Sequence, residues 1–265
     1  MAGALILTYH AIEAGPAPLC TDPRRFEAQV DAVVESGAEV VTVRDLAERL
    51  RSGTLGEAST VVLTFDDGFT SVAETAAPLL RARNLPATVF CVAGHLGGSS
   101  DWETARNGGF RSRIASAEAL RRLAAAGFEL GSHGVDHSPL ADASGPTLRR
   151  EIVESRTALE DLLETQVTSF AYPYGAVPDR AGRELVAETY RAACTTVLGR
   201  IPAAGDPLRL ARVDAHYLRD PDRLARALRG ELGGYLFARG VAARARRTIV
   251  KDYARAAGRD GGLTE

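Results

Sequence analysis

The sequence lacks the features that mark a disulfide-rich, membrane-spanning or nucleic-acid-binding protein. Its three cysteines, in 265 residues, are an odd number and stand far apart, so they do not form a disulfide framework. No apolar run approaches the roughly 20 residues that a transmembrane helix requires. The formal net charge of -2 gives no basic excess for nucleic acid or an anionic membrane. We therefore expect a globular protein of a reducing compartment, with no nucleic-acid partner and no membrane span.

The first ten residues are apolar, but they lack the basic start and the length of a signal peptide. Residues 4–9 form a continuous apolar run, which is typical of a strand buried on both faces. We therefore predict a buried first strand and a cytoplasmic location.

Strand patterns and helical patterns alternate along the chain. The expected strands are 4–9, 40–43, 60–65, 87–92, 128–130, 167–172, 190–195 and 208–213. The expected helices are 22–36, 44–51, 71–83, 116–126, 145–165 and 179–189. This alternation predicts an α/β fold with a parallel sheet, and seven or eight strands are compatible with a closed or nearly closed barrel.

The tail has a different composition. Residues 223–257 are helical in pattern and rich in arginine, which is interspersed with alanine and leucine. This pattern favours solvated helices packed on the barrel over a docking helix for a membrane or a partner. We predict a catalytic barrel domain in residues 1–220 and a helical C-terminal extension in residues 221–265.

Two adjacent carboxylates, Asp66 and Asp67, directly follow one of the expected strands. Active sites of parallel α/β proteins lie at the carboxyl ends of strands. Neighbouring aspartates repel each other unless a cation or a proton lies between them. Because Asp-Gly is also a strong turn signal, the segment from Thr64 to Gly68 is by itself equally compatible with an ordinary turn.

His133 and His137 follow another expected strand, four residues apart. This spacing places two imidazoles on the same side of a helical turn, where both can reach one metal ion. Two histidines and one aspartate leave positions open for water and substrate, which is the pattern of a catalytic zinc site. Surface or capping histidines are the alternative for this pair taken alone.

Two further segments have the composition of a binding site. Pro173 and Gly175 shape a tight turn after a strand, and its backbone N–H groups can point at a reacting oxygen. An ordinary turn after a buried strand is the simpler interpretation of that segment alone. Residues 94–113 read as a long loop that contains the only tryptophan, Trp102. Its indole can stack on a sugar face, or it can anchor the loop.

Taken together, these segments resemble the polysaccharide deacetylase family, also called the NodB-homology domain or carbohydrate esterase family 4. The resemblance rests on TFDDG, SHxxxH and FAYPYG in this order, each after a strand, and on LTYHAI and PATVF. It runs from about residue 5 to about residue 215. The resemblance implies a distorted (β/α)7-type barrel, here with a C-terminal helical appendage. It also implies a hydrolase that removes an N-acetyl group from an N-acetylated sugar.

The resemblance also implies roles for single residues. Asp66 would be the general base, and Asp67, His133 and His137 would bind a divalent metal, for which zinc is preferred. The turn at Tyr174 would supply a backbone N–H to the oxyanion. Such a metal polarises the amide carbonyl and lowers the pKa of water, so that acetate and a free amine result.

The sequence departs from the family pattern in places. Ala171 stands where the family has an arginine that steadies the catalytic aspartate, and Arg212 is the candidate to replace it. The family's late Leu-His acid motif is not recognisable. We prefer His10 over His216 as the group that protonates the leaving amine, because His10 ends the first strand. The residues expected to contact substrate are Trp102, Tyr172, Tyr174 and His216.

Other functions stay open at this point. A hydrolase of the same fold that cleaves a cyclic amide or imide, or an O-acetyl ester, is compatible with these departures. A non-catalytic sugar-binding module is the alternative from another class, and retention of both aspartates and both histidines argues against it. In the cytoplasm the substrate would be a nucleotide- or lipid-linked sugar, a glycan precursor or an amino-sugar intermediate. The sequence predicts neither the native metal nor the oligomeric state.

Overall fold

The structure, a computed structural model, describes residues 3–56, 59–103 and 110–235. Within them, eight strands form one sheet in which every neighbouring pair is parallel. The strands are β1 Ala4–Tyr9, β2 Glu39–Val41, β3 Thr60–Phe65, β4 Thr88–Cys91, β5 Glu129–Ser132, β6 Ser169–Ala171, β7 Ala192–Cys194 and β8 Val213–Asp214. Their order is β7-β6-β5-β4-β3-β1-β8, and β2 pairs with the amino-terminal half of β3.

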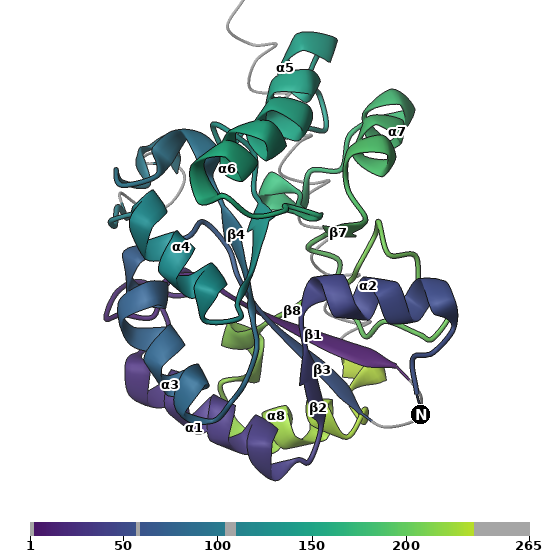
Figure 1. The fold of residues 1–265 in the computed structure, drawn as a ribbon. Helices are drawn as coiled ribbons and strands as arrows, with labels where there is room; N and C mark the ends of the chain where they lie inside the picture. The colour runs from purple at the N-terminus through teal and green to yellow at the C-terminus, as the bar shows by residue number, and fades with distance from the viewer. Residues whose placement is uncertain (1–2, 57–58, 104–109, 236–265) are drawn as a thin grey trace, which may run out of the picture.

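Helices connect these strands (Figure 1). The α-helices are α1 Pro23–Glu35, α2 Val43–Ser52, α3 Ala77–Ala82, α4 Ala117–Ala125, α5 Gly145–Arg149, α6 Ser155–Leu163, α7 Arg180–Thr189 and α8 Pro221–Leu228. Two π-helical turns, η1 Val72–Ala76 and η4 Arg150–Glu154, precede α3 and α6. The short 3-10 turns are η2 Ala93–His95, η3 Asp101–Glu103, η5 Pro173–Gly175 and η6 Ala215–Leu218. Side-chain caps explain several helix starts; the Thr42 hydroxyl, for example, accepts the Asp45 N–H in a capping box.

The sheet is buried on both faces. Leu5 and Leu7 of β1 belong to the core beneath α1, α3, α4 and α6, whereas Ala4 and Ile6 pack with the apolar side of α2. Figure 1 accordingly shows α2 on the opposite side of the strands from α1, α3 and α4. This double burial explains why the strands are continuous apolar runs.

The predicted (β/α) barrel fold is confirmed, but the barrel closes irregularly. The last strand, expected at residues 208–213, is only β8, Val213–Asp214. Among the described residues, isolated bridges from Leu210 to Cys194 and from Ile201 to Ala4 replace a ladder between β7 and β8. The segment between them contains prolines, which cannot donate a ladder hydrogen bond. The sheet is therefore a distorted half-barrel rather than a regular cylinder.

The predicted C-terminal extension is described only in part. Helix α8 buries Leu224, Ala227 and Leu228 in the core shared with α1. The boundary at residue 220 stays a prediction, and the arginine-rich stretch beyond residue 235 lies outside the described residues.

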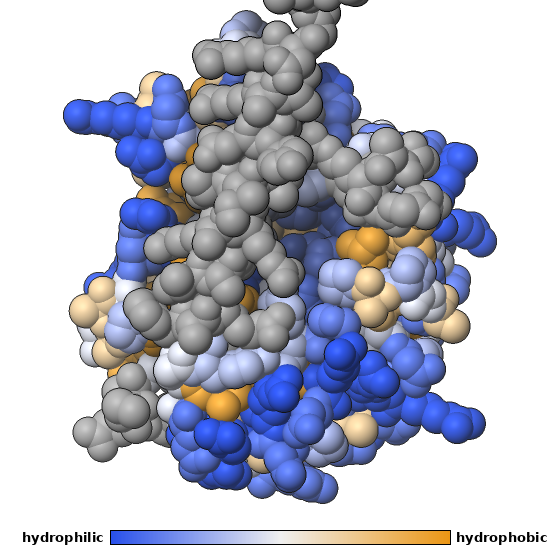
Figure 2. Space-filling view, turned by 180° about the vertical axis from the view of Figure 1, so that it is seen from behind, coloured by the Kyte–Doolittle hydropathy of each residue, from blue (hydrophilic) through white to orange (hydrophobic). Residues whose placement is uncertain are grey.

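The surface of the described part is mostly polar. Among these residues, the exposed large hydrophobic side chains are Val34, Leu162 and Val197, which belong to separate parts of the chain. The face in Figure 2 accordingly shows only small apolar patches outside its grey atoms. No helix in the described ranges combines the length and the apolar character needed to cross a bilayer.

Candidate metal centre

The carboxyl ends of neighbouring parallel strands bring the predicted motifs together. Asp66 follows β3 and donates its backbone N–H to the Tyr9 carbonyl, at 2.9 Å. His133 follows β5 and donates its N–H to the Cys91 carbonyl, at 2.8 Å. These bonds continue the strand pairing by one residue, so the sheet itself fixes where the two side chains begin.

Asp67, His133 and His137 turn one ligand atom each toward a common point. The His133 and His137 Nε2 atoms lie 3.2 Å apart. Asp67 Oδ1 lies 3.7 Å from His133 Nε2 and 3.4 Å from His137 Nε2. Ligand atoms about 2.0–2.1 Å from a tetrahedral zinc ion lie about 3.3–3.4 Å from one another. The spacing of this triangle, which we call the ligand triangle, therefore suits a single ion.

The protonation of the ligand triangle also suits a cation. His133 Nδ1 lies 2.7 Å from the Ala171 carbonyl and donates to it, so Nε2 is the ring nitrogen that faces inward. Burial, followed by the nearby His133, lowers the pKa of His137 well below the ordinary range, so its imidazole is neutral. Asp67 Oδ1 is buried without a hydrogen-bond partner. These residues fit a divalent metal ion, which would satisfy all three inward-facing atoms.

Asp66 forms an ion pair with Arg212, the residue that the sequence analysis names as its candidate partner. Arg212 donates from Nη1 to Asp66 Oδ1 at 2.7 Å and from Nη2 to Oδ2 at 2.8 Å. Both side chains are buried. Burial alone would raise the pKa of Asp66, but the Arg212 guanidinium and the nearby His133 together outweigh it and hold this pKa well below the usual range. The arginine that the sequence lacks at Ala171 is thus supplied in space by Arg212, just before β8.

Left-handed backbone is concentrated at this site. Asp67 (φ 72°), His137 (φ 55°) and Tyr174 (φ 57°) are three of the five described non-glycine residues with positive φ. Such conformations cost free energy and persist where the surrounding structure imposes them, often at functional sites. The turn that holds Asp67, the turn that holds His137 and the turn at Tyr174 therefore all have a constrained backbone.

A cavity of about 300 Å³ opens onto the ligand triangle. The Trp102 ring lies 5.1 Å from the His137 ring, and the Tyr174 ring lies 4.5 Å from it. His10 enters from the end of β1, and its Nδ1 is buried without a hydrogen-bond partner. The wall consists of Thr8, His10, Leu19, Asp66, Asp67, Trp102, His133, His137, Tyr172, Tyr174, Thr196, Leu198, Arg212, Asp214 and Tyr217.

The structure brings together every predicted site residue except one. His216 does not line this cavity; it is half-buried, with its ring 5.9 Å from that of Tyr217. Tyr172 lines the cavity but is only 1% exposed, and its hydroxyl donates to the Leu208 carbonyl at 3.5 Å. The catalytic and substrate-binding roles of these residues stay predictions.

Sequence reasoning missed several wall residues, of which Asp214 is the most informative. It is the last residue of β8, much as Asp66 directly follows β3, and burial raises its pKa. A carboxylate at a strand end was the available signal, but the strand itself was misplaced. Leu19, Leu198 and Tyr217 come from irregular segments, where no periodic pattern pointed to them.

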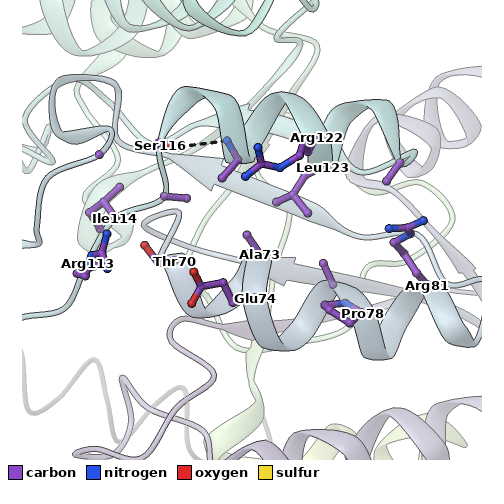
Figure 3. A pocket seen from close by; sticks show the side chains of 15 residues that line it. Thr70, Ala73, Glu74, Pro78, Arg81, Arg113, Ile114, Ser116, Arg122 and Leu123 are labelled. Atoms are coloured by element: carbon purple, nitrogen blue, oxygen red, sulfur yellow. Dashed lines mark hydrogen bonds between the residues drawn. The ribbon is translucent and has the colours of Figure 1, made fainter.

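A second cavity, of about 350 Å³, lies on the outer side of the barrel between α3 with η1 and α4. Figure 3 shows Thr70 and Glu74 on one side of it and Ser116, Arg122 and Leu123 on the other. Its lining contains neither histidine nor cysteine and has a single carboxylate. It therefore offers no ligand set comparable to the ligand triangle.

Comparison with known proteins gives matches at the family and fold levels. The family profile described as "Polysaccharide deacetylase" matches residues 55–193, just over half of the chain. YxkH of Bacillus subtilis (strain 168) is 24% identical over 194 residues, which cover 73% of this chain and 64% of YxkH. The poly-beta-1,6-N-acetyl-D-glucosamine N-deacetylase of Staphylococcus aureus (strain N315) is 26% identical over 165 residues, 58% of this chain and 53% of that enzyme. The chain thus spans less than two thirds of the length of these relatives.

Solved structures match over most of the chain. The deacetylase PplD of Streptococcus pyogenes, in complex with acetate, has a TM-score of 0.73 at 23% identity, covering 85% of this chain and 98% of that one. IcaB from Ammonifex degensii has a TM-score of 0.70 at 22% identity, covering 86% and 96%. At these identities the likeness establishes the fold.

Proposed function

The chain belongs to the polysaccharide deacetylase family, a family of hydrolases, and from this premise we propose that it is a metal-dependent N-deacetylase. Its substrate is an N-acetylated amino sugar, within a glycan, a glycolipid or a precursor of either, and its metal is zinc. The products are acetate and a free amine. The name of the S. aureus relative, an N-acetylglucosamine polymer deacetylase, supports this choice of substrate class.

The observation that carries the proposal is the ligand triangle beside an ionised carboxylate. Three buried ligand atoms lie 3.2–3.7 Å apart, and one of them, Asp67 Oδ1, has no hydrogen-bond partner. Asp66 stands next in the chain but faces Arg212 instead. The two carboxylates therefore have separate tasks, one as a ligand and the other as a base.

The chain's own residues account for the remaining chemistry. Asp67, His133 and His137 would hold a divalent ion, which would supply Lewis acidity at this point of the cavity. Asp66 is ionised because of Arg212, so it can accept the proton of the attacking water. The turn at Tyr174 contributes its backbone N–H to the oxyanion. His10, which lines the same cavity, delivers a proton to the leaving amine.

Acetate release tests this function. The purified protein, with zinc and after treatment with a chelator, is incubated with N-acetylglucosamine oligosaccharides. We expect acetate release that is lost on chelation, restored by zinc, and lost in Asp66→Asn with the metal retained. Metal-independent acetate release would contradict the proposed role of the metal.

The same assay separates the alternative substrates. Acetate release from an O-acetyl ester but from none of the N-acetyl sugars would make the protein an esterase, and ring opening of a cyclic amide without acetate release would make it an amidohydrolase. A chain that binds the oligosaccharides without turnover or metal would be a binding module. The cytoplasmic location is likewise a proposal, which cell fractionation tests.

A further inference from the structure

The loop that carries His133 and His137 is wrapped around one buried carboxylate, that of Glu151. Glu151 is only 1% exposed and comes from η4, the π-helical turn of a different segment. It accepts the backbone N–H of Val135 at 3.0 Å, of Asp136 at 3.1 Å and of Ser138 at 3.4 Å. Three amides of the loop therefore converge on one anion, as in the backbone nests that bind anions.

The shape of the loop depends on this contact. The donating amides flank His137, whose φ of 55° is strained for a residue with a Cβ. Gly134 has a φ of 86°, and a Cβ at this position would collide with Glu151 Oε2. The glycine thus admits the carboxylate, and the carboxylate in turn holds the strained histidine turn.

Glu151 is itself fixed to the strand that leads into the loop. The Ser155 hydroxyl donates to the Glu151 carbonyl at 2.6 Å, and the Ser132 hydroxyl donates to Ser155 Oγ at 2.9 Å. Ser132 is the last residue of β5 and precedes His133. Helical π-turns occur often at functional sites, and here one places a glutamate beneath a pair of metal ligands.

We propose that Glu151 is a positioning residue of the metal centre. It holds the backbone of residues 134–138 so that the Nε2 atoms of His133 and His137 converge with Asp67 Oδ1. This inference rests on the proposed metal site. Loss of a group that orients metal ligands weakens metal binding by roughly 10–100-fold.

The chain offers a matched control in Glu129, a second buried glutamate at the opposite end of β5. Glu129 accepts from the hydroxyls of Thr88 and Ser169 and from the Arg44 N–H. A glutamine there can direct its NH2 to the Ser169 hydroxyl, which can accept, and its oxygen to Arg44.

A glutamine at position 151 cannot satisfy the corresponding hydrogen bonds. Both oxygens of Glu151 accept from backbone N–H groups, so the NH2 of a glutamine would face a donor in either orientation. Glu151→Gln should therefore disturb the loop, whereas Glu129→Gln should leave it in place.

The test is the affinity for Co²⁺ in full-length wild type, Glu151→Gln and Glu129→Gln. Trp102 is the only tryptophan, and its ring lies 5.1 Å from the His137 ring, so quenching of its fluorescence reports Co²⁺ at the site. We expect the Kd to rise roughly 10–100-fold in Glu151→Gln and to stay within about twofold of wild type in Glu129→Gln. Urea unfolding of both metal-free variants shows whether the loss of affinity exceeds what reduced stability explains.

Three outcomes overturn the inference, and they are distinguishable. If Glu151→Gln binds Co²⁺ as wild type does, Glu151 does not position the ligands, although the proposed function stands. If both variants lose affinity equally, the effect is general destabilisation. If wild type itself binds no Co²⁺, the proposed metal site fails first.

Two further variants keep the test decisive if Glu151→Gln does not fold. Gly134→Ala displaces the same carboxylate from the loop side, and we expect it to lose Co²⁺ affinity on the same scale. Arg150→Gln breaks only the exposed ion pair of Arg150 with Asp136, 2.7 Å, in the same loop, and should leave the affinity unchanged. Wild-type affinity in Gly134→Ala would contradict the proposal.

Discussion

The two ends of the sheet each bury a carboxylate and surround it differently. At the amino end, Glu129 is 3% exposed and accepts hydrogen bonds from Thr88, Ser169 and the backbone of Arg44 at 2.7–2.9 Å. At the carboxyl end, Asp67 is 5% exposed, and its Oδ1 has no hydrogen-bond partner among the described residues. The first turn of α2 also contacts the amino end, where the Arg44 N–H meets Glu129, whereas the carboxyl end opens into a cavity.

The hydrogen-bond partners of a buried carboxylate distinguish one with a structural role from a candidate metal ligand. A buried acceptor without a partner costs about 1–3 kcal/mol, and more when it is charged. This fold is able to satisfy a buried carboxylate, as Glu129 shows. The unsatisfied Asp67 Oδ1 therefore opposes folding, and the proposed cation would offset that cost.

The largest effect is expected for Asp67→Asn. Acetate release should fall by roughly 10³–10⁴-fold, the scale seen when a catalytic group is replaced. The metal-free variant should nevertheless be at least as stable as metal-free wild type, because a buried carboxylate whose Oδ1 has no hydrogen-bond partner is removed. Zinc should raise the Tm of wild type but not of the variant. Calorimetry with and without zinc measures the stability of the metal-free proteins and the effect of zinc on Tm. A metal-free variant that is less stable than metal-free wild type would contradict the claim that Asp67 opposes folding.

The next largest effect is expected for Arg212→Gln, which leaves Asp66 buried without its guanidinium. Breaking a buried pair in this way costs about 3–5 kcal/mol of folding free energy. Arg49→Gln is the matched control, because Arg49 makes an equally short contact with Glu39, 2.6 Å, on the exposed surface. An exposed pair contributes about 0–1 kcal/mol. Urea unfolding compares the two, and equal losses would show that Arg212 is not paired in a buried site.

A smaller, pH-dependent effect is expected at the amino end. Burial raises the pKa of Glu129 in the folded protein, although its three donors partly oppose this. The folded state therefore binds a proton there more tightly than the unfolded state. The resulting stabilisation is fully present below the unfolded-state pKa and is lost as pH rises through the folded-state pKa.

Glu129→Gln should remove this dependence at a cost of about 1 kcal/mol in acid. Unfolding free energies of wild type and variant at pH 5 and pH 8 provide the measurement. The difference should shift in favour of the variant at the higher pH. A difference that is constant with pH would mean that Glu129 stays ionised in both states.

The smallest effect concerns two cysteines in the core between the two ends of the sheet, whose thiols should not react in the native protein. Burial raises the pKa of the Cys91 and Cys194 thiols to about 12, so neither forms a thiolate near neutral pH. Alkylation of the native protein, read by mass spectrometry, should leave both unmodified until urea unfolds the chain. Labelling of Cys91, which lies beneath Gly68, would show that the aspartate turn opens in the native state.

Local patterns were sufficient to predict the strand ends that carry the site. The adjacent aspartates and the paired histidines lie directly after apolar strands, and parallel strands bring such ends together. Arg212 was predicted as a partner of Asp66, but its two-pronged contact spans 146 residues of sequence, and no local pattern encodes that geometry.

Other features could not be predicted because they depend on tertiary contacts. Glu151 lies in a charged helical segment, where its local pattern is that of a solvent-exposed residue, but the structure buries it within the π-helical turn η4. The barrel closure was misread for a similar reason. The apolar residues before Arg212 favour a strand, but Pro202 and Pro207 restrict the preceding chain to isolated bridges.

The most direct test of the central claim is a crystal structure of the zinc-loaded protein with anomalous diffraction at the zinc edge. The account predicts one anomalous peak about 2.0–2.2 Å from Asp67 Oδ1 and from the Nε2 atoms of His133 and His137. Asp66 should remain hydrogen-bonded to Arg212 and should not coordinate the ion. An absent peak, or a zinc ion held by Asp66 instead of Asp67, would contradict the assignment of the two carboxylates.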